Sequence, residues 1–178
     1  MVDIYEEAIK EAFASCPTDA VILHTIELVH SYFITDAGLP TSIKIVHNTE
    51  NIIAGIEATA PIDRGKMVEF IAMPFEMILP ENSKDKIPEI KITIDNVAGE
   101  IIKAVSGASE RYEQIRLIYR PYLSTDLSRP QLKKPPVFYI GNIYADNYKI
   151  TCAAKIKDYL NLVFLSRTYT IDQFPGLI

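Results

Sequence analysis

The sequence predicts a mainly β fold of the α+β class. We expect an antiparallel β-sandwich or barrel of roughly nine strands, with an N-terminal helix and one or two short flanking helices. Two observations favour this fold. Segments rich in β-branched and aromatic residues alternate apolar and polar positions, as half-buried strands do. Turn signals separate these segments about every 8 to 12 residues. We expect a single domain over residues 1–178, with residues 166–178 as an extended C-terminal tail.

The elements of the first half begin with a helix at Asp3–Ser15, where apolar residues repeat at helical spacing and Pro17 ends the pattern. Ala20–Ile34 is dense in Val, Ile, Leu, Tyr and Phe, which predicts a long strand. Residues 43–45 and 52–58 alternate apolar and mostly polar positions on either side of the turn residues 47–50, and we interpret them as one hairpin. Further elements are a turn at 63–65 and strands at 67–73 and 75–79, with Pro74 marking a bend, a bulge or an edge.

The second half contains the clearest strand of the chain. Glu89–Asp95 alternates strictly, which predicts a sheet with one solvated face. A short helix follows, capped by Asp95 or Asn96 and ended by Gly107. The remaining expected elements are a solvated loop at 80–88, a strand at 113–123, an extended exposed loop at 124–136, a hairpin of 137–144 with 148–154, and a helical turn at 156–162.

Composition excludes several classes of protein. A chain of 178 residues with 48% hydrophobic and 23% charged residues has the profile of a folded soluble domain rather than a disordered segment. The net charge of -5 argues against nucleic acid as the principal partner. No apolar run approaches the roughly 20 residues that span a bilayer, so we expect no membrane insertion. The acidic N-terminus is unlike a signal peptide, which favours synthesis in the cytoplasm.

A search for chemistry yields no catalytic, cofactor-binding or metal-binding assignment, and we expect no cofactor. Phosphate-binding, dinucleotide-binding, nucleophile-elbow and zinc-protease motifs are absent from the sequence. The best metal candidate is His24, Glu27 and His30, but on a strand Glu27 points away from the two histidines. Cys16 and Cys152 are expected to be small buried residues.

Charge is unevenly distributed along the chain. Residues 111–134 hold six basic and two acidic residues, a net +4, which leaves -9 for the rest. This segment is open to three interpretations: a solvated strand face, a nucleic-acid surface, or a protein interface that meets an acidic neighbour. Its Arg and Tyr content suits the third. The candidate interface residues here are Tyr119, Arg120, Tyr122, Arg129, Lys133 and Lys134.

The C-terminus is unusually apolar for a chain end. It contains Phe174, Pro175, Gly176 and Leu177, which complete the candidate interface. Termini normally fray unless they are docked. The segment therefore either fills the core of its own domain or inserts into an adjacent subunit.

Several segments together resemble a family of phage proteins catalogued as domain of unknown function 1833. These segments are Thr25–Leu28 with His30, Lys44–Asn48, Pro74–Glu76, Ile92–Val97, Tyr119–Ser124 and Phe174–Leu177. The Ile-Asp-Asn-Val junction at 94–97 is also similar to one in tail-tip hub proteins of long, non-contractile phage tails. Residues 151–154 lack the Gly-Arg pair expected from the family. The resemblance implies a component of the virion tail tip with no known catalytic residues.

We therefore predict a structural protein, not an enzyme, that acts in tail assembly through protein–protein contacts. Its expected partners are other phage tail proteins, with a homo-oligomeric ring as one arrangement. It would be made in the cytoplasm of the bacterial host and would then become part of the virion tail. The alternative is a β-sandwich that binds carbohydrate or acts as a hydrolase at the cell envelope; a deep pocket with clustered carboxylates or exposed aromatic residues would favour it.

Overall fold

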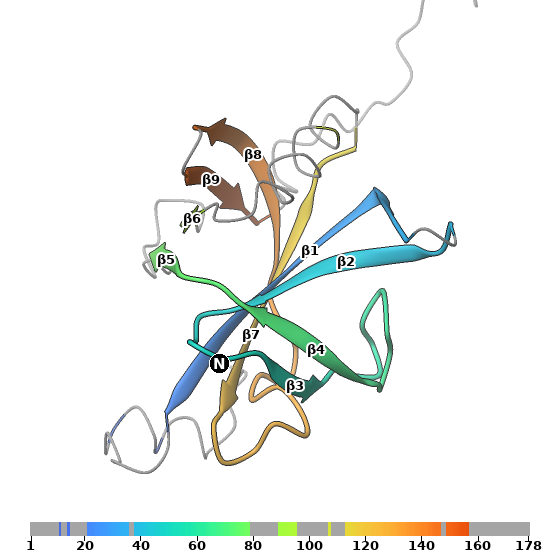
Figure 1. Cartoon of the computed structure of the whole chain (residues 1–178), viewed down its shortest axis with the longest axis vertical. Helices are drawn as coiled ribbons and strands as arrows, with labels where there is room; N and C mark the ends of the chain where they lie inside the picture. The colour runs from blue at the N-terminus through green and yellow to red at the C-terminus, as the bar shows by residue number, and fades with distance from the viewer. Residues whose placement is uncertain are drawn as a thin grey trace, which may run out of the picture.

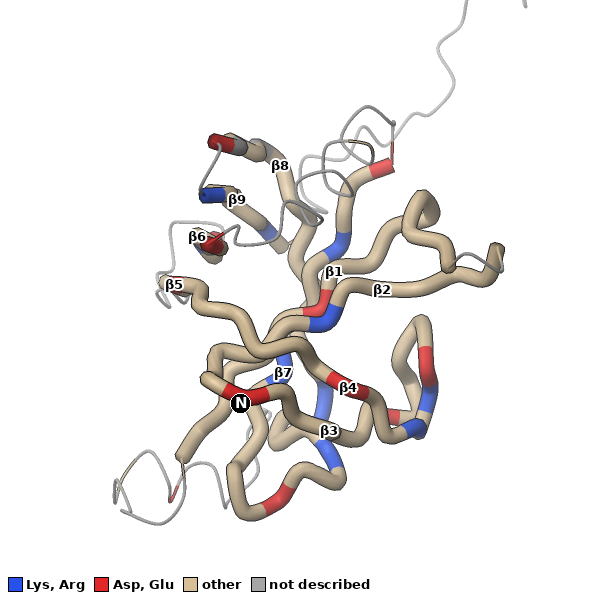
Figure 2. Tube along the Cα trace, viewed as in Figure 1, with Lys and Arg blue, Asp and Glu red and all other residues tan. Residues whose placement is uncertain are grey.

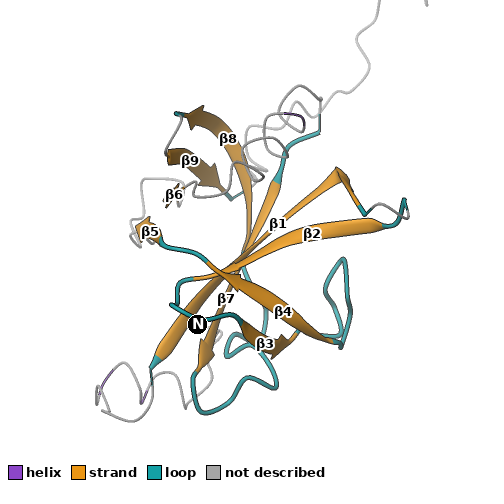
Figure 3. Ribbon diagram, viewed as in Figure 1, coloured by secondary structure: helices purple, strands orange, loops and turns teal. Residues whose placement is uncertain are grey.

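The computed structural model describes residues 21–35, 38–78, 89–95, 113–146 and 149–156, together with Glu11, Ala14 and Gly107. These residues form nine strands in one open sheet (Figures 1 and 3). The mainly β prediction is confirmed, whereas the single sheet does not support a sandwich or barrel. The strands are β1 (Ile22–Ile34), β2 (Pro40–Val46), β3 (Ile52–Gly55), β4 (Met67–Ala72), β5 (Phe75–Ile78), β6 (Glu89–Asp95), β7 (Arg116–Leu123), β8 (Val137–Ala145) and β9 (Lys149–Lys155).

The strand order is β3-β4-β2-β1-β7-β8-β9-β6-β5. Neighbouring strands are antiparallel except β2 and β4, which are parallel. The green strands β4 and β5 follow one another in Figure 1, separated only by Met73 and Pro74. The Met73 N–H donates to the carbonyl of Val46 at 3.0 Å, and the Asp95 N–H donates to the carbonyl of Pro74 at 3.2 Å. This two-residue link therefore contacts β2 and β6, and it interrupts the strand at Pro74, where a bend, a bulge or an edge was expected.

Strand β1 is buried on both of its faces. Side chains alternate along a strand, so Ile26 and Leu28 point to one side and Thr25 and Glu27 to the other, yet all four are buried. Ile26 and Leu28 belong to the larger core, which includes residues of β2 and of β5 to β9. The opposite face packs under a second, smaller core made of Leu23, Val46, Ile52, Ala54, Ile56, Ala60, Phe70 and Tyr122.

The predicted hairpin around residues 47–50 is wrong. Strand β2 pairs with β1 and β4, and β3 pairs with β4, so β2 and β3 are not partners. The alternation of both strands was interpreted correctly, but alternation does not specify a partner. The turn at 63–65 is confirmed and lies in the connection from β3 to β4. Asp63 and Gly65 there have φ values of 53° and 65°, the left-handed region that tight turns use.

The other strand predictions agree with the structure. The long strand near Ala20–Ile34, the alternating strand Glu89–Asp95 with one solvated face, and the hairpin of β8 and β9 are all present. The loop at 124–136 is not fully exposed, because Gln131 and Leu132 are buried. The predicted helices, the loop at 80–88, the turn at 156–162 and the tail at 166–178 lie outside the described residues, apart from Glu11, Ala14, Gly107 and Ile156.

Candidate functional site

Strands β3 and β4 form a two-stranded ribbon at one end of the sheet, hereafter the ribbon. Directly paired residues of antiparallel strands share a face, and the pairs run from Ile52 with Phe70 to Gly55 with Met67. Ile52 and Phe70 point inward to the smaller core. Ile53, Met67 and Ile71 are 61%, 57% and 52% exposed. The ribbon therefore carries large apolar side chains on its solvent side as well as on its buried side.

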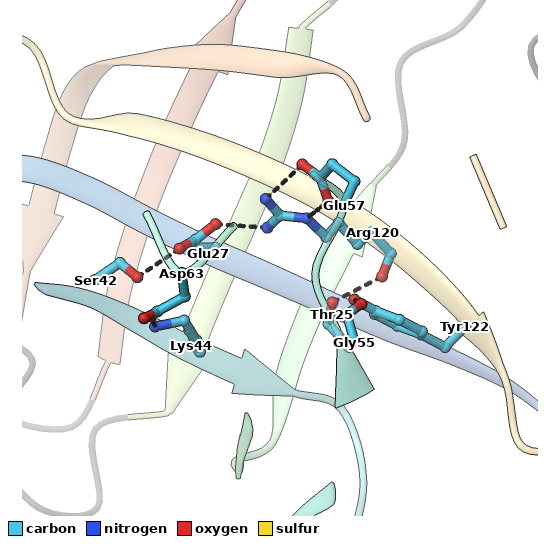
Figure 4. A network of polar contacts seen from close by, with 9 residues as sticks. All are labelled: Thr25, Glu27, Ser42, Lys44, Gly55, Glu57, Asp63, Arg120 and Tyr122. Carbon is cyan, nitrogen blue, oxygen red and sulfur yellow. Dashed lines mark hydrogen bonds and ion pairs between the residues drawn. The ribbon is translucent and has the colours of Figure 1, made fainter. Parts of the chain in front are cut away.

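A buried arginine holds the start of the β3–β4 connection onto the sheet (Figure 4). Arg120, on β7, donates from Nε to Glu57 at 2.7 Å and from Nη2 at 2.9 Å. Its Nη1 donates to Glu27 of β1 at 2.6 Å. The side chains of Arg120 and Glu27 are fully buried. Because a bidentate pair fixes both distance and orientation, Glu57 keeps its segment in one position over β1 and β7.

A second ion pair holds the end of the same connection. Lys44 of β2 donates to Asp63 at 2.9 Å. Lys44 lies directly opposite Glu27 in the β1–β2 register, and Ser42 donates to the second carboxylate oxygen of Glu27. In Figure 2 a red (acidic) stretch and a blue (basic) stretch accordingly lie next to each other near the centre of the view, where β1 and β2 overlap. The connection is thus attached to the sheet by oppositely charged pairs at both of its ends.

Gly55 fits the ribbon tightly against the segment that follows β7. Its N–H donates to the carbonyl of Leu127 at 2.8 Å, and its carbonyl accepts from the Tyr122 hydroxyl at 2.8 Å. A Cβ at position 55 would lie 1.9 Å from the Ser128 carbonyl oxygen. Only glycine allows the two backbones to approach this closely.

The pKa shifts in this cluster follow from burial and pairing. Burial opposes the charge of Arg120, but hydrogen bonds to Glu57 and attraction to Glu27 outweigh it and raise the pKa of the guanidinium. Burial raises the pKa of the Tyr122 hydroxyl. The hydrogen bond from Lys44 lowers the pKa of Asp63. Arg120 and Asp63 are therefore charged, and Tyr122 neutral, at neutral pH.

Three of the predicted interface residues lie in the interior. Tyr119, Arg120 and Tyr122 are 4%, 0% and 0% exposed, so their proposed place on an outer face is corrected. The three interpretations of residues 111–134, a solvated strand face, a nucleic-acid surface or a protein interface, all place these side chains on the surface. Arg120 and Tyr122 lie under the ribbon and its connection, where Glu27, Glu57 and the Gly55 carbonyl accept their hydrogen bonds. Tyr119 lies on the opposite face of β7, in the larger core.

The predicted cations of the following loop do reach the surface. Arg129, Lys133 and Lys134 are exposed, whereas Gln131 and Leu132 between them are buried. The Gln131 N–H donates to the carbonyl of Pro121 at 3.0 Å, which fixes the loop against β7. Through Leu127 the same loop contacts β3. Exposed cations therefore extend from a segment attached to the ribbon. Phe174, Pro175, Gly176 and Leu177 lie outside the described residues.

The rejected metal candidate does not assemble in the structure. His24 contacts the Tyr119 hydroxyl through Nδ1, and His30 contacts the Glu113 carbonyl through Nε2. Glu27 lies on the other side of β1, bound to Arg120. Within the described ranges no group of three or more His, Cys, Asp or Glu is placed to hold a metal ion. Cys152 is buried as predicted, and burial raises the pKa of its thiol to about 11.

Sequence reasoning missed the exposed side of the ribbon. The sequence of residues 67–72 indicates a strand that is apolar on both faces, because apolar residues occupy both alternating positions and only Glu69 is charged. Such a strand is normally buried on both faces. At a sheet edge the same pattern leaves one apolar face without a cover, and only the strand order shows that β4 lies next to the end of the sheet.

Fold and site together define a mainly β protein with a single sheet. Ion pairs in its interior fix the connection between the two strands of the apolar ribbon at one end of that sheet. The chain belongs to the family described as Domain of unknown function (DUF1833), which it matches over residues 8–169. No curated protein matches the sequence. Among the residues that the structure describes, no helix has the length and apolar character required to cross a membrane.

Proposed function

We propose that this chain is a structural subunit of a phage or prophage tail tip that acts through protein–protein contacts. It would be synthesised in the cytoplasm of the bacterial host and incorporated into the virion tail with other tail proteins. The observation that carries the proposal is the ribbon: three large apolar side chains lie exposed together on an element that buried ion pairs hold in place.

The surroundings of the ribbon suit a protein partner. Interfaces between proteins combine an apolar centre with a polar rim. Here Ile53, Met67 and Ile71 supply the centre, and Glu69 lies among them, accepting a hydrogen bond from Asn51 at 3.0 Å. The loop that contacts β3 through Leu127 also carries exposed Arg129, and further along, beside β7, exposed Lys133 and Lys134. A fixed apolar surface with a charged margin favours assembly over chemistry.

The restriction to a tail tip comes from the resemblance described above rather than from the fold. The family match supports the resemblance only as far as the domain family. The proposal takes the tail tip from the similarity of the Ile-Asp-Asn-Val junction to one in tail-tip hub proteins. The genes that flank the coding sequence give an independent test. Tape-measure and tail-assembly genes on both sides are expected, and metabolic neighbours would contradict the proposal.

The direct test is an assembly assay in the phage or prophage that encodes the chain. We expect Ile53→Asp with Met67→Asp to lower the yield of infectious particles at least a hundredfold, and Lys133→Glu with Lys134→Glu to lower it less. Ile78→Asp is the matched control, because Ile78 is a strand isoleucine, 67% exposed, on β5. Intact infectious tails from the ribbon variant, with the protein shown to be folded by circular dichroism, would refute the proposal.

A further inference from the structure

The loop between β7 and β8 is attached to β7 by two backbone hydrogen bonds. The Gln131 N–H donates to the carbonyl of Pro121 at 3.0 Å, and the Tyr119 N–H donates to the carbonyl of Pro136 at 3.3 Å. The two contacted residues of β7 lie close together along that strand. The loop residues between the two contacts, 132–135, are therefore confined to a short excursion beside β7.

This excursion is buried at both of its ends and exposed in its middle. Leu132 belongs to the larger core, and Pro135 is buried as well. Lys133 and Lys134 between them are exposed. Because proline fixes φ and both flanking side chains are buried, the backbone of the two lysines has little conformational freedom. The structure therefore presents two adjacent ammonium groups from a fixed piece of backbone.

The two ammonium groups have no counter-charge in the residues around them. Residues 127–145 contain Arg129, Lys133 and Lys134 but no Asp or Glu. Arg129 interacts electrostatically with Asp126. Among the residues that the structure describes, other lysines form ion pairs with carboxylates, whereas Lys133 and Lys134 do not. The pair is therefore available to carboxylates from outside the chain.

An acidic protein segment fits this pair better than a nucleic acid or a membrane does. Single-stranded nucleic acids stack their bases on exposed aromatic side chains, but Tyr119 and Tyr122 of the neighbouring strand are only 4% and 0% exposed. Attraction to anionic lipid relies on clusters of about four to eight cations. An acidic segment of a protein needs to supply only one carboxylate to each lysine.

We propose that Lys133 and Lys134 form a docking site for an acidic segment of a neighbouring protein. A preformed site orders little on binding, so less of the interaction free energy is lost as conformational entropy. Complementary charge guides the encounter and fixes the register of the two surfaces. This site differs in chemistry from the ribbon, which offers an apolar surface. It names the kind of partner for the assembly function proposed above and rests on that function.

Binding of an acidic peptide tests the site directly. The probe is a fluorescein-labelled poly-glutamate peptide, and its fluorescence anisotropy at low ionic strength gives the Kd. Lys133→Gln with Lys134→Gln should raise the Kd at least about fivefold, because two exposed ion pairs are lost. The matched control is Lys149→Gln with Lys155→Gln, whose side chains are both 59% exposed on β9 and each already face a carboxylate. It should change the Kd less than about twofold. Equal losses in the two double variants, both shown to be folded by circular dichroism, would overturn the proposal.

Two further probes test the class of partner. A single-stranded DNA oligonucleotide of the same net charge as the peptide, and phosphatidylserine vesicles, should both bind more weakly than the peptide. Tighter binding of either through the same lysines would overturn the assignment to a protein. If the wild type does not bind the peptide, the docking site fails and the assembly function stands, because its test concerns the ribbon. If the peptide binds as expected but the ribbon variant gives infectious tails, the assembly function fails and the docking site stands.

Discussion

The Arg120 guanidinium donates to both carboxylate oxygens of Glu57, at 2.7 Å and 2.9 Å, although 63 residues separate them in the sequence. Glu57 comes from the connection between β3 and β4, and Arg120 comes from β7 beneath it. Their pairing converts an exposed connection into a fixed part of the fold. The position of the apolar ribbon therefore depends on a polar contact in the interior.

Removing this arginine should be strongly destabilising. Arg120→Met leaves Glu27 and Glu57 without their cation, and breaking a buried pair from one side costs about 3–5 kcal/mol. Urea denaturation followed by circular dichroism measures the loss. The triple variant with Glu27→Leu and Glu57→Leu removes the unpaired charges and should recover at least half of the loss. A single variant within about 1 kcal/mol of the wild type would contradict the structural role given to the pair.

Gly55→Ala tests the close approach of the ribbon to the segment after β7. The added methyl group would lie 1.9 Å from the Ser128 carbonyl oxygen, and neither backbone can move freely. We expect a loss of about 3 kcal/mol, the upper end of ordinary overpacking costs. Gly141→Ala is the control, because its nearest heavy atom would be 3.9 Å away. Similar melting temperatures for the two variants would show that the ribbon is not held tightly.

Stability should fall between neutral and mildly acidic pH in a manner that depends on His24. Burial, and then the nearby His47, lower the pKa of His24 below its ordinary value of 6.5. Below pH 6.5 the unfolded chain therefore binds a proton that the folded chain resists, so stability decreases as the pH falls toward the lower, folded-state pKa.

The variant His24→Asn keeps a polar group near the Tyr119 hydroxyl but does not titrate. The difference in its free energy of unfolding between pH 7.5 and pH 5.5 should be smaller than that of the wild type. Parallel pH profiles for the two proteins would exclude His24 as the titrating group.

Cys152 should be unreactive in the folded protein. Its thiol is buried in the larger core, and burial raises its pKa to about 11. In a Cys16→Ser background, a thiol reagent at pH 8 should label the protein at least a hundredfold faster in denaturant than in buffer. Rapid labelling of the folded protein would mean that β9 opens readily.

The strands of the described residues were largely predictable from sequence, whereas the environment of their polar residues was not. Strict alternation correctly identified Glu89–Asp95, and a dense apolar run identified β1. The same rule failed for Arg120, because alternation assigns a side chain to a face of the sheet and does not reveal what covers that face. Glu27, the partner of Arg120, lies 93 residues away in the sequence.

Pairing was the second failure, and it has a similar cause. The residues around His47 have turn chemistry and alternating flanks, which favour a hairpin. Strand β3 instead pairs with β4 through the turn at Asp63 and Gly65, while β2 pairs with β1. Turn residues lie on both sides of β3, and alternation alone does not show which of the two turns joins paired strands. The exposed ribbon was missed because its apolar residues indicate burial in sequence alone.

The Met73–Pro74 link gives the molecule a short path for mechanical load. A partner that pulls on the ribbon pulls on β4, and β4 reaches β5 through two residues of covalent chain. Backbone hydrogen bonds tie these residues to Val46 on β2 and to Asp95 on β6. Force applied to β4 therefore reaches β5 through this covalent link, and the hydrogen bonds share part of it with β2 and β6, so the two ends of the strand order are mechanically coupled.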